Sequence, residues 1–457
     1  MSFLEYIKEN KARYEDELIS FLRIPSVSTE PSHDPETRRC AEFVRDELSR
    51  IGMDNVAIYE TARHPVVFGQ RLDAGEGAHT VLFYGHYDVQ PVDPLNLWTN
   101  PPFEPTIVGD QIYARGASDD KGQVFLQLKA LEALLKTEGK LPVNVKVIIE
   151  GEEEIGSPNL EPFLEKYREM LSCDTVLVSD TPMYDYGMPS LCYGLRGLCY
   201  MELEVTGPNR DLHSGSYGGV VENPINALSR IISKLKGEDG HILIDGFYDS
   251  VRSVEPEERK ELARLPFDEA ARKADLEVGT FTGEQDYSPL ERIWARPTLD
   301  ANGIWGGFAG SGAKTVLPSK AGAKVSMRLV PDQTPGEIAK LFEAYVKKIT
   351  PPGVIVKVTD LHGGLPAVTP IDSAGVRAAR RALKEVFGRE PFLTREGGSI
   401  PIVNSFLKIL EAPTVLMGFT MPDQNAHSPN EKMYLPGFHD GVRATALFYK
   451  ELAKEAK

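Results

Sequence analysis

The stretch TVLFYGHYD, residues 80–88, is a short apolar run that ends at a glycine and is followed at once by a histidine and an aspartate. Two further apolar runs, Val143–Ile149 and Thr175–Val178, have the length and composition of buried strands. Apolar side chains at helical spacing predict a helix between the first two, over about Lys121–Lys136. Strands that alternate with helices indicate an α/β fold with a mostly parallel central sheet.

Each of these strands is followed by side chains that bind cations or move protons. His86 and Asp88 follow the first strand, Glu153 and Glu154 follow the second, and Asp180 follows the third. The carboxyl ends of parallel strands meet at one edge of a sheet, and binding sites form there. We therefore expect these side chains to converge.

A set of nitrogen and oxygen donors without thiolates emerges when two more residues are added: His86, Asp119, Glu154, Asp180 and His427. Such a set suits a pair of Zn or Mn ions, with one carboxylate bridging both. Two metals acidify a water molecule and polarise a carbonyl group. Glu153, next to a ligand but not itself required as one, is expected to accept the proton of that water.

Each of these residues also has a structural interpretation. Asp119 and Asp120 stand before the predicted helix, where acidic side chains cap the backbone and complement the helix dipole. A histidine at a strand end is commonly a core residue, and the run Glu152–Glu154 is explained as a solvated acidic loop. Crowded like charges repel unless cations compensate them, so the whole set together is harder to explain by structure alone.

The rest of the chain predicts two structural parts. Amphipathic helices are expected at about 3–22 and 34–51. A strand-helix-strand-helix-strand order then follows, at about 198–205, 224–235, 323–329, 335–349 and 354–359. This order predicts a separate small α+β unit, an open-faced sandwich. After Gly363 the α/β pattern resumes, with a helix at about 373–387 and a strand at about 414–418. We predict a catalytic domain over 1–195 and 364–457, interrupted by an inserted domain over 196–363.

Composition excludes several classes of partner. The 457 residues include 51 Lys and Arg against 67 Asp and Glu, so the net charge is −16. This charge gives no basic surface for nucleic acid and is repelled by an anionic membrane. No apolar run reaches the roughly 18 residues that span a bilayer. The four cysteines are too sparse for a disulfide scaffold. We expect a cytoplasmic protein with neither a nucleic acid nor a membrane partner.

Ten blocks, in order along nearly the whole chain, match motifs of a known family. They are YGHYDVQPV (84–92), GASDDKG (116–122), EGEEEIGS (150–157), VSDTPMY (178–184), LRG (195–197), DLHSGSYGG (211–219), GSGAKTVLP (310–318), MRLVP (327–331), REGGSIP (395–401) and AHSPNE (426–431). On these blocks the chain resembles the M20-type metallopeptidases, and within them the branch of the carnosine and cytosolic non-specific dipeptidases. Carboxypeptidase G and succinyl-diaminopimelate desuccinylase are related to the same family. The resemblance implies a zinc-peptidase-like three-layer catalytic domain and an inserted α+β, ferredoxin-like lid or dimerisation domain.

The resemblance also assigns roles around the two metals. One ion is held by His86, Asp119 and Asp180, and the other by Asp119, Glu154 and His427. Glu153 is the general base for a metal-bridging water, and Asp88 orients the first histidine. The peptide between Asp119 and Asp120 is expected to be cis.

Further implied roles fall on the inserted domain and on one later loop. His213 is expected to reach the active site of a neighbouring subunit in a homodimer formed through the lid, and to stabilise the oxyanion there. Arg328 is expected to clamp the terminal carboxylate of the substrate. The remaining substrate-binding residues are Thr315, Ser399 and His362.

The function implied is hydrolysis of dipeptides or short peptides that carry a free C-terminal carboxylate. An N-acyl-amino-acid deacylase or desuccinylase that uses the same site is the main alternative. A two-metal phosphoesterase and a non-catalytic metal-binding scaffold are more remote. Activity on dipeptides, compared with N-acetyl or N-succinyl amino acids, separates the first two.

Overall fold

The computed structural model describes residues 1–397, 400 and 402–455. The chain divides into two compact units, and each is described by itself. The first comprises Met1–Tyr193, Thr369–Thr394 and Ile402–Lys457, and the second comprises Gly194–Val368 and Arg395–Pro401. No helix of the described residues is long and apolar enough to cross a membrane.

A sheet with a parallel centre forms the middle of the first unit. Its strands follow the order β1-β2-β6-β3-β7-β17-β8. The four central strands, β6, β3, β7 and β17, are parallel, whereas the pairs towards both edges are antiparallel. The strands are β1 (Asp54–Tyr59), β2 (Val66–Arg71), β3 (Thr80–His86), β6 (Asn144–Glu150), β7 (Thr175–Val178), β8 (Ser190–Leu195), β16 (Phe392–Glu396) and β17 (Thr414–Leu416).

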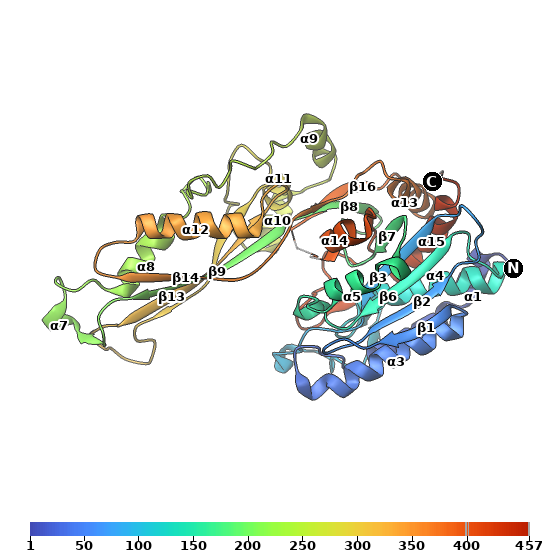
Figure 1. Ribbon diagram of the computed structural model, residues 1–457, viewed down its shortest axis with the longest axis horizontal. Helices are drawn as coiled ribbons and strands as arrows, with labels where there is room; N and C mark the ends of the chain where they lie inside the picture. The colour runs from blue at the N-terminus through green and yellow to red at the C-terminus, as the bar shows by residue number, and fades with distance from the viewer. Residues whose placement is uncertain (398–399, 401, 456–457) are drawn as a thin grey trace. The chain divides into compact units, whose positions relative to one another are not determined.

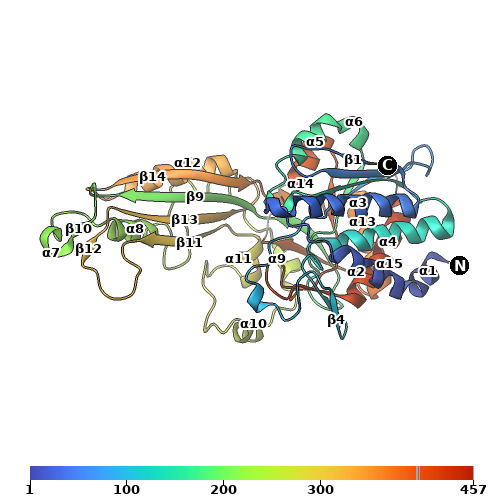
Figure 2. The same ribbon diagram turned by 90° about the horizontal axis from the view of Figure 1, so that it is seen from below.

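Helices cover both faces of this sheet, so the first unit has three layers (Figures 1 and 2). Strand β3 shows the two faces clearly. A Cβ atom on Gly85 would lie 2.6 Å from the Val124 side chain of helix α4, while the ring of Tyr84 packs on the opposite face, 5.2 Å from that of Phe406. The helices are α1 (Phe3–Glu9), α2 (Lys11–Leu22), α3 (Asp34–Ile51), α4 (Lys121–Glu138), α5 (Leu160–Lys166), α6 (Arg168–Leu171), α13 (Ala374–Phe387), α14 (Ile402–Ser405) and α15 (Leu435–Leu452).

Helix α4 is buried almost all round, because it lies between the sheet and the outer helices. Its buried charges are therefore paired. The ammonium group of Lys129 lies 2.5 Å from a carboxylate oxygen of Glu47 and 3.3 Å from one of Glu132, and it also contacts Glu17. These three glutamates form a cluster of carboxylates whose counter-ion is the ammonium group of Lys129.

The N-terminal helix differs from its prediction. A single helix was expected over about 3–22, but the structure has α1 and α2, which meet at Asn10. The Asn10 side chain donates a hydrogen bond of 2.8 Å to the carbonyl of Tyr6. Asparagine side chains form such bonds to the nearby backbone and favour helix ends over helix interiors, which fits a break at this position.

A small three-stranded sheet, in the order β18-β5-β4, also belongs to the first unit. Its strands are β4 (Thr106–Val108), β5 (Gln111–Tyr113) and β18 (Lys432–Tyr434). It brings the segment that precedes helix α4 beside the segment that follows residue 427, since Lys432 pairs with Tyr113.

The second unit is built on a four-stranded antiparallel sheet of order β11-β13-β9-β14. Helices α8 and α12 pack on one of its faces (Figure 1). With the strands in this spatial order, the chain order β-α-β-β-α-β is that of a ferredoxin-like fold. The elements are β9 (Gly197–Thr206), α8 (Pro224–Ser233), β11 (Thr298–Gly306), β13 (Lys320–Leu329), α12 (Pro335–Ile349) and β14 (Ile355–Gly364).

Buried and half-buried residues alternate strictly along β9, and this pattern shows which face of the sheet the helices cover. Cys199, Met201, Leu203 and Val205 are buried against the helices, while the residues between them point to the open face. The unit also contains β10 (Leu212–His213), α7 (Ser214–Tyr217), α9 (Pro256–Ala263), α10 (Glu269–Asp275), α11 (Pro289–Trp294), β12 (Val316–Leu317) and β15 (Ala367–Val368).

A glycine comparison tests how tightly helix α4 is seated. A Cβ atom on Gly122 would lie 1.9 Å from the carbonyl oxygen of Ala117, whereas one on Gly336 would meet nothing within 4 Å. Both glycines are the second residue of a helix. We expect Gly122→Ala to lower the urea midpoint of unfolding, because relieving the overlap costs about 1–3 kcal/mol. Gly336→Ala is expected to raise stability by about 0.4–1 kcal/mol, since alanine restricts the unfolded chain. Equal midpoints for the two variants would contradict this seating.

Candidate metal centre

The parallel strands deliver polar side chains to one edge of the central sheet. His86 is the last residue of β3, Glu153 and Glu154 follow β6, and Asp180 follows β7. Strands β6 and β7 flank β3 on either side. The convergence that the sequence predicts therefore follows from the parallel order of three neighbouring strands.

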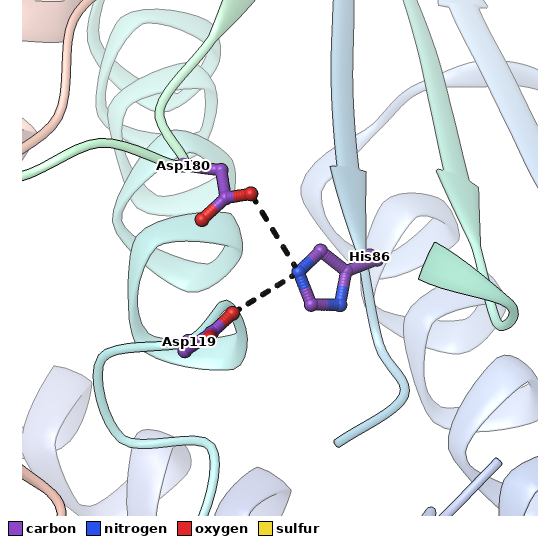
Figure 3. Close-up of side chains that lie close together, drawn as sticks. All are labelled: His86, Asp119 and Asp180. Atoms are coloured by element: carbon purple, nitrogen blue, oxygen red, sulfur yellow. Dashed lines mark ion pairs between the residues drawn. The ribbon is translucent and has the colours of Figure 1, made fainter. Parts of the chain in front are cut away.

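The first group of side chains comprises His86, Asp119 and Asp180, whose candidate ligand atoms all lie within 4.8 Å of one another. The Nε2 atom of His86 lies 3.3 Å from Oδ1 of Asp119 and 3.9 Å from Oδ2 of Asp180. Figure 3 shows the same ring nitrogen facing both carboxylates.

The second group comprises Asp119, Glu154 and His427, again with ligand atoms within 4.8 Å. The Nε2 atom of His427 lies 2.9 Å from Oδ2 of Asp119 and 3.3 Å from Oε2 of Glu154. Asp119 thus turns one oxygen towards each histidine. This is the arrangement required of a carboxylate that bridges two cations.

Unusual backbone carries two of these residues. The peptide between Asp119 and Asp120 is cis, as predicted. His427 has a left-handed backbone with φ of 59°, and Asn425 and Asn430 in the same loop have φ of 58° and 61°. Left-handed conformations of residues with side chains cluster at functional sites, where the surroundings hold them in place.

The electrostatics of the cluster favour added positive charge. Burial raises the pKa of Asp180 to about 7, reinforced by the negative charge of Asp119. The same two causes raise the pKa of Glu154. Burial also opposes ionisation of Asp119, but the adjacent imidazoles of His427 and His86 outweigh it and lower its pKa. Like charges held this close in a protein interior are stabilised by cations.

The protonation pattern of His86 fits a metal. Its Nδ1 atom lies 3.1 Å from the carbonyl oxygen and 3.3 Å from the Oδ1 atom of Asp88, both acceptors, so Nδ1 carries the proton. The Nε2 atom is buried and has no hydrogen-bond partner among the residues that the structure describes. When this nitrogen is deprotonated, its lone pair points between two carboxylates. These nitrogen and oxygen donors suit Zn or Mn.

Asp88 holds more than the histidine. Its two carboxylate oxygens accept hydrogen bonds from the backbone N–H groups of Glu153, at 3.2 Å, and Glu154, at 3.1 Å. The side chain of Glu153 belongs to neither ligand group. Burial raises its pKa well above the usual value, His86 opposes this, and the charge of Asp180 adds to it. A carboxylate with a raised pKa beside the cluster suits a general base.

Two residues without a role in the sequence analysis contact the cluster. Gln90 donates a hydrogen bond of 2.7 Å from Nε2 to Oε2 of Glu154. Glu431 lies buried against the backbone of Asp119. Both are in blocks that carry the family resemblance. Their spacing in the sequence could have pointed to them, because each stands four residues after a histidine of the ligand set.

The predicted substrate residues lie in the second unit. His213 and Thr315 are neighbours, since β10 pairs with β12 and the N–H of Ser214 donates to the carbonyl of Thr315 at 3.1 Å. Arg328 and His362 point to the open face of the sheet on either side of β9, where they pair with Leu198 and Tyr200. Ser399 lies outside the described residues.

The tautomer of His213 can be assigned from one contact. Its Nδ1 atom accepts a hydrogen bond of 3.0 Å from the N–H of Gly215. In the neutral ring the proton is therefore on Nε2, which leaves the exposed edge of the ring as a donor.

Comparisons with known proteins identify the family of this chain. Residues 82–451 match the profile of "Peptidase family M20/M25/M40". The chain is 33% identical to the Beta-Ala-His dipeptidase of Homo sapiens, over 98% of this chain and 92% of that protein. It is also 33% identical to the Cys-Gly metallodipeptidase dug1 of Schizosaccharomyces pombe, over 98% and 97% of the two chains. The crystal structure of human carnosine dipeptidase 1 superposes with a TM-score of 0.87 at 32% identity, covering 99% and 98%. The chain belongs to the peptidase family M20/M25/M40.

Proposed function

We propose that this protein is a dinuclear metal-dependent dipeptidase, which hydrolyses dipeptides or short peptides with a free C-terminal carboxylate. The observation that carries the proposal is the position of Asp119, with one oxygen towards His86 and the other towards His427. Zn or Mn is the proposed metal, because the donors are nitrogen and oxygen without sulfur. Relatives that are named as dipeptidases support the substrate class.

Five side chains would hold the two ions: His86, Asp119 and Asp180 one, and Asp119, Glu154 and His427 the other. When bound, two divalent cations would acidify a water molecule and polarise the scissile carbonyl. Glu153 takes the proton of the attacking water and delivers it to the leaving amine. Asp88 keeps the proton of His86 on Nδ1 and fixes the backbone of Glu153, so it orients both a ligand and the base.

Residues of the second unit bind the substrate in this proposal. Arg328 binds the terminal carboxylate in bidentate fashion, helped by Thr315, Ser399 and His362. Arg328 is half-buried, and burial lowers its pKa while Glu396 opposes the shift. A partly desolvated guanidinium gains more from a carboxylate than an exposed one does. His213 donates from Nε2 to the developing oxyanion.

We further propose a homodimer formed through the second unit, in which His213 serves the active site of the partner subunit. A cytoplasmic location is proposed as well. All four cysteines, Cys40, Cys173, Cys192 and Cys199, are free, which accords with a reducing compartment.

The substrate class is tested with a dipeptide library on metal-free and metal-loaded protein. Removal of metal by a chelator is expected to abolish hydrolysis, and added Zn or Mn is expected to restore it. A parallel panel of N-acetyl and N-succinyl amino acids tests the deacylase alternative. Turnover of the acylated panel with none of any dipeptide would replace the dipeptidase by that alternative.

The base is tested by Glu153→Gln, which keeps the shape of the side chain but cannot accept the proton. We expect kcat on a dipeptide to fall by about 10²–10⁴-fold with metal content nearly unchanged. Glu161→Gln, at a partly exposed glutamate of α5 that pairs with Lys408, is the matched control and should keep full activity. Undiminished turnover by Glu153→Gln would remove this residue from the mechanism.

The shared site is tested by mixing two inactive variants, His213→Ala and Glu153→Ala, under conditions of subunit exchange. If each site uses its own Glu153 and the partner's His213, a mixed dimer has one complete site of two. Random exchange of an equal mixture should then restore about a quarter of the wild-type activity. Absence of any restoration, with exchange demonstrated by tagged subunits, would place His213 outside the partner's site.

A further inference from the structure

Glu431 is completely buried, and its carboxylate accepts five hydrogen bonds. Its Oε1 atom accepts from the backbone N–H groups of Ser118, at 2.9 Å, and Asp119, at 3.0 Å, and from the Ser118 hydroxyl at 3.0 Å. Its Oε2 atom accepts from the N–H of Gly116 at 2.9 Å and from Nη1 of Arg115 at 2.8 Å. The carboxylate therefore holds the backbone of the whole segment that ends at the candidate bridging ligand.

The same residue closes the loop that carries His427. Its own carbonyl oxygen accepts a bond of 3.1 Å from the N–H of Ala114. One residue earlier, Asn430 receives a bond of 2.7 Å from the N–H of Thr99 and donates one of 3.0 Å to the carbonyl of Leu97. The loop is thus fixed at its end, just after the left-handed residues that it contains.

Arg115 extends this fixation to a third segment. Its side chain is almost fully buried, its Nη2 atom donates to the carbonyl of Pro91 at 2.9 Å, and its guanidinium lies 5.3 Å from the ring centre of Trp98. Residues 91–98 follow the segment that carries His86, Asp88 and Gln90. Glu431 and Arg115 therefore connect three chain segments that supply candidate metal ligands.

We propose that Glu431 is a positioning residue, which sets the separation of Asp119 and His427 and so preorganises the two-metal site. It needs no contact with metal or substrate to do this, because it acts through the backbone of Asp119 and through the end of the His427 loop. A charged acceptor is required, since three N–H groups, a hydroxyl and a guanidinium all donate to it. The inference rests on the metal centre of the proposed function, but not on the identity of the substrate.

Glu431→Gln is the direct test, and the affinity of the metal-free protein for Zn²⁺ is the readout. The amide nitrogen of glutamine presents its own hydrogens to donors that expect an acceptor. We expect affinity for at least one of the two ions to fall about 10–100-fold, as measured by competition with a chelator. Two ions bound with wild-type affinity by a folded Glu431→Gln protein would overturn the proposal.

Glu132→Gln is the matched control for a buried carboxylate that serves the fold alone. Glu132 is fully buried and pairs with Lys129, Arg13 and Arg50. It stands 11 residues after the first residue of α4, or about 17 Å along the helix. We expect Glu132→Gln to lower the melting temperature while Zn²⁺ affinity stays as in the wild type. If this control lost as much Zn²⁺ affinity, the effect of Glu431→Gln would be explained by general destabilisation of the fold, and the proposal would fail.

A double variant separates the ion pair from the backbone contacts if Glu431→Gln alone is poorly folded. Arg115→Met combined with Glu431→Gln leaves no buried charge without a partner, so folding should recover. Because the glutamine amide has a single acceptor oxygen in place of two, at least one of the N–H groups of Gly116, Ser118 and Asp119 still lacks its acceptor, and we expect the weak Zn²⁺ affinity to persist. Recovery of full affinity in the double variant would contradict the proposal. Since the readout is metal binding, failure of every dipeptide assay leaves the outcome of this test intact.

Discussion

Carboxylates that converge on one edge of a parallel sheet are the constraint on which the rest of this structure depends. Four carboxylates lie close together there and repel one another: those of Asp119, Glu153, Glu154 and Asp180. Burial raises the pKa of the last three. The surrounding structure resists this repulsion at several points. Asp88 fastens the backbone after β6, and Glu431 fastens the backbone before α4.

The central elements could be predicted from sequence because each has a clear period and clear ends. Four predicted elements agree with the structure to within a few residues: the strands that begin at residues 80 and 175, and the helices at 34–51 and 335–349. Helix α15 was not predicted, although its polar residues Asp440, Arg443 and Lys450 recur at helical spacing among buried apolar ones. Strand β11 was missed because it is an exposed edge strand with an irregular register near Gly303.

Part of the candidate site could likewise be predicted from the sequence, and part of it could not. The two ligand groups that the structure brings together have the composition expected from strand ends and from the family resemblance. What the sequence could not provide is the network behind them, because its contacts join residues more than 300 positions apart, such as Ser118 and Glu431. Hydrogen bonds from backbone N–H groups leave no pattern in a sequence, since every residue except proline offers the same donor. The pairing of β10 with β12, which places His213 beside Thr315, was equally invisible.

The cluster around Lys129 has a consequence for where the protein can bind metal. Glu17, Glu47 and Glu132 have the spacing of a third metal-binding group, yet an ammonium from the neighbouring helical turn already occupies their centre. A tethered counter-ion cannot diffuse away, so a divalent ion would have to expel it and leave a buried lysine unsatisfied. The acidic cluster at Lys129 is thereby closed to a divalent ion, and of the three such groups in the described residues the two at the edge of the sheet stay open to one.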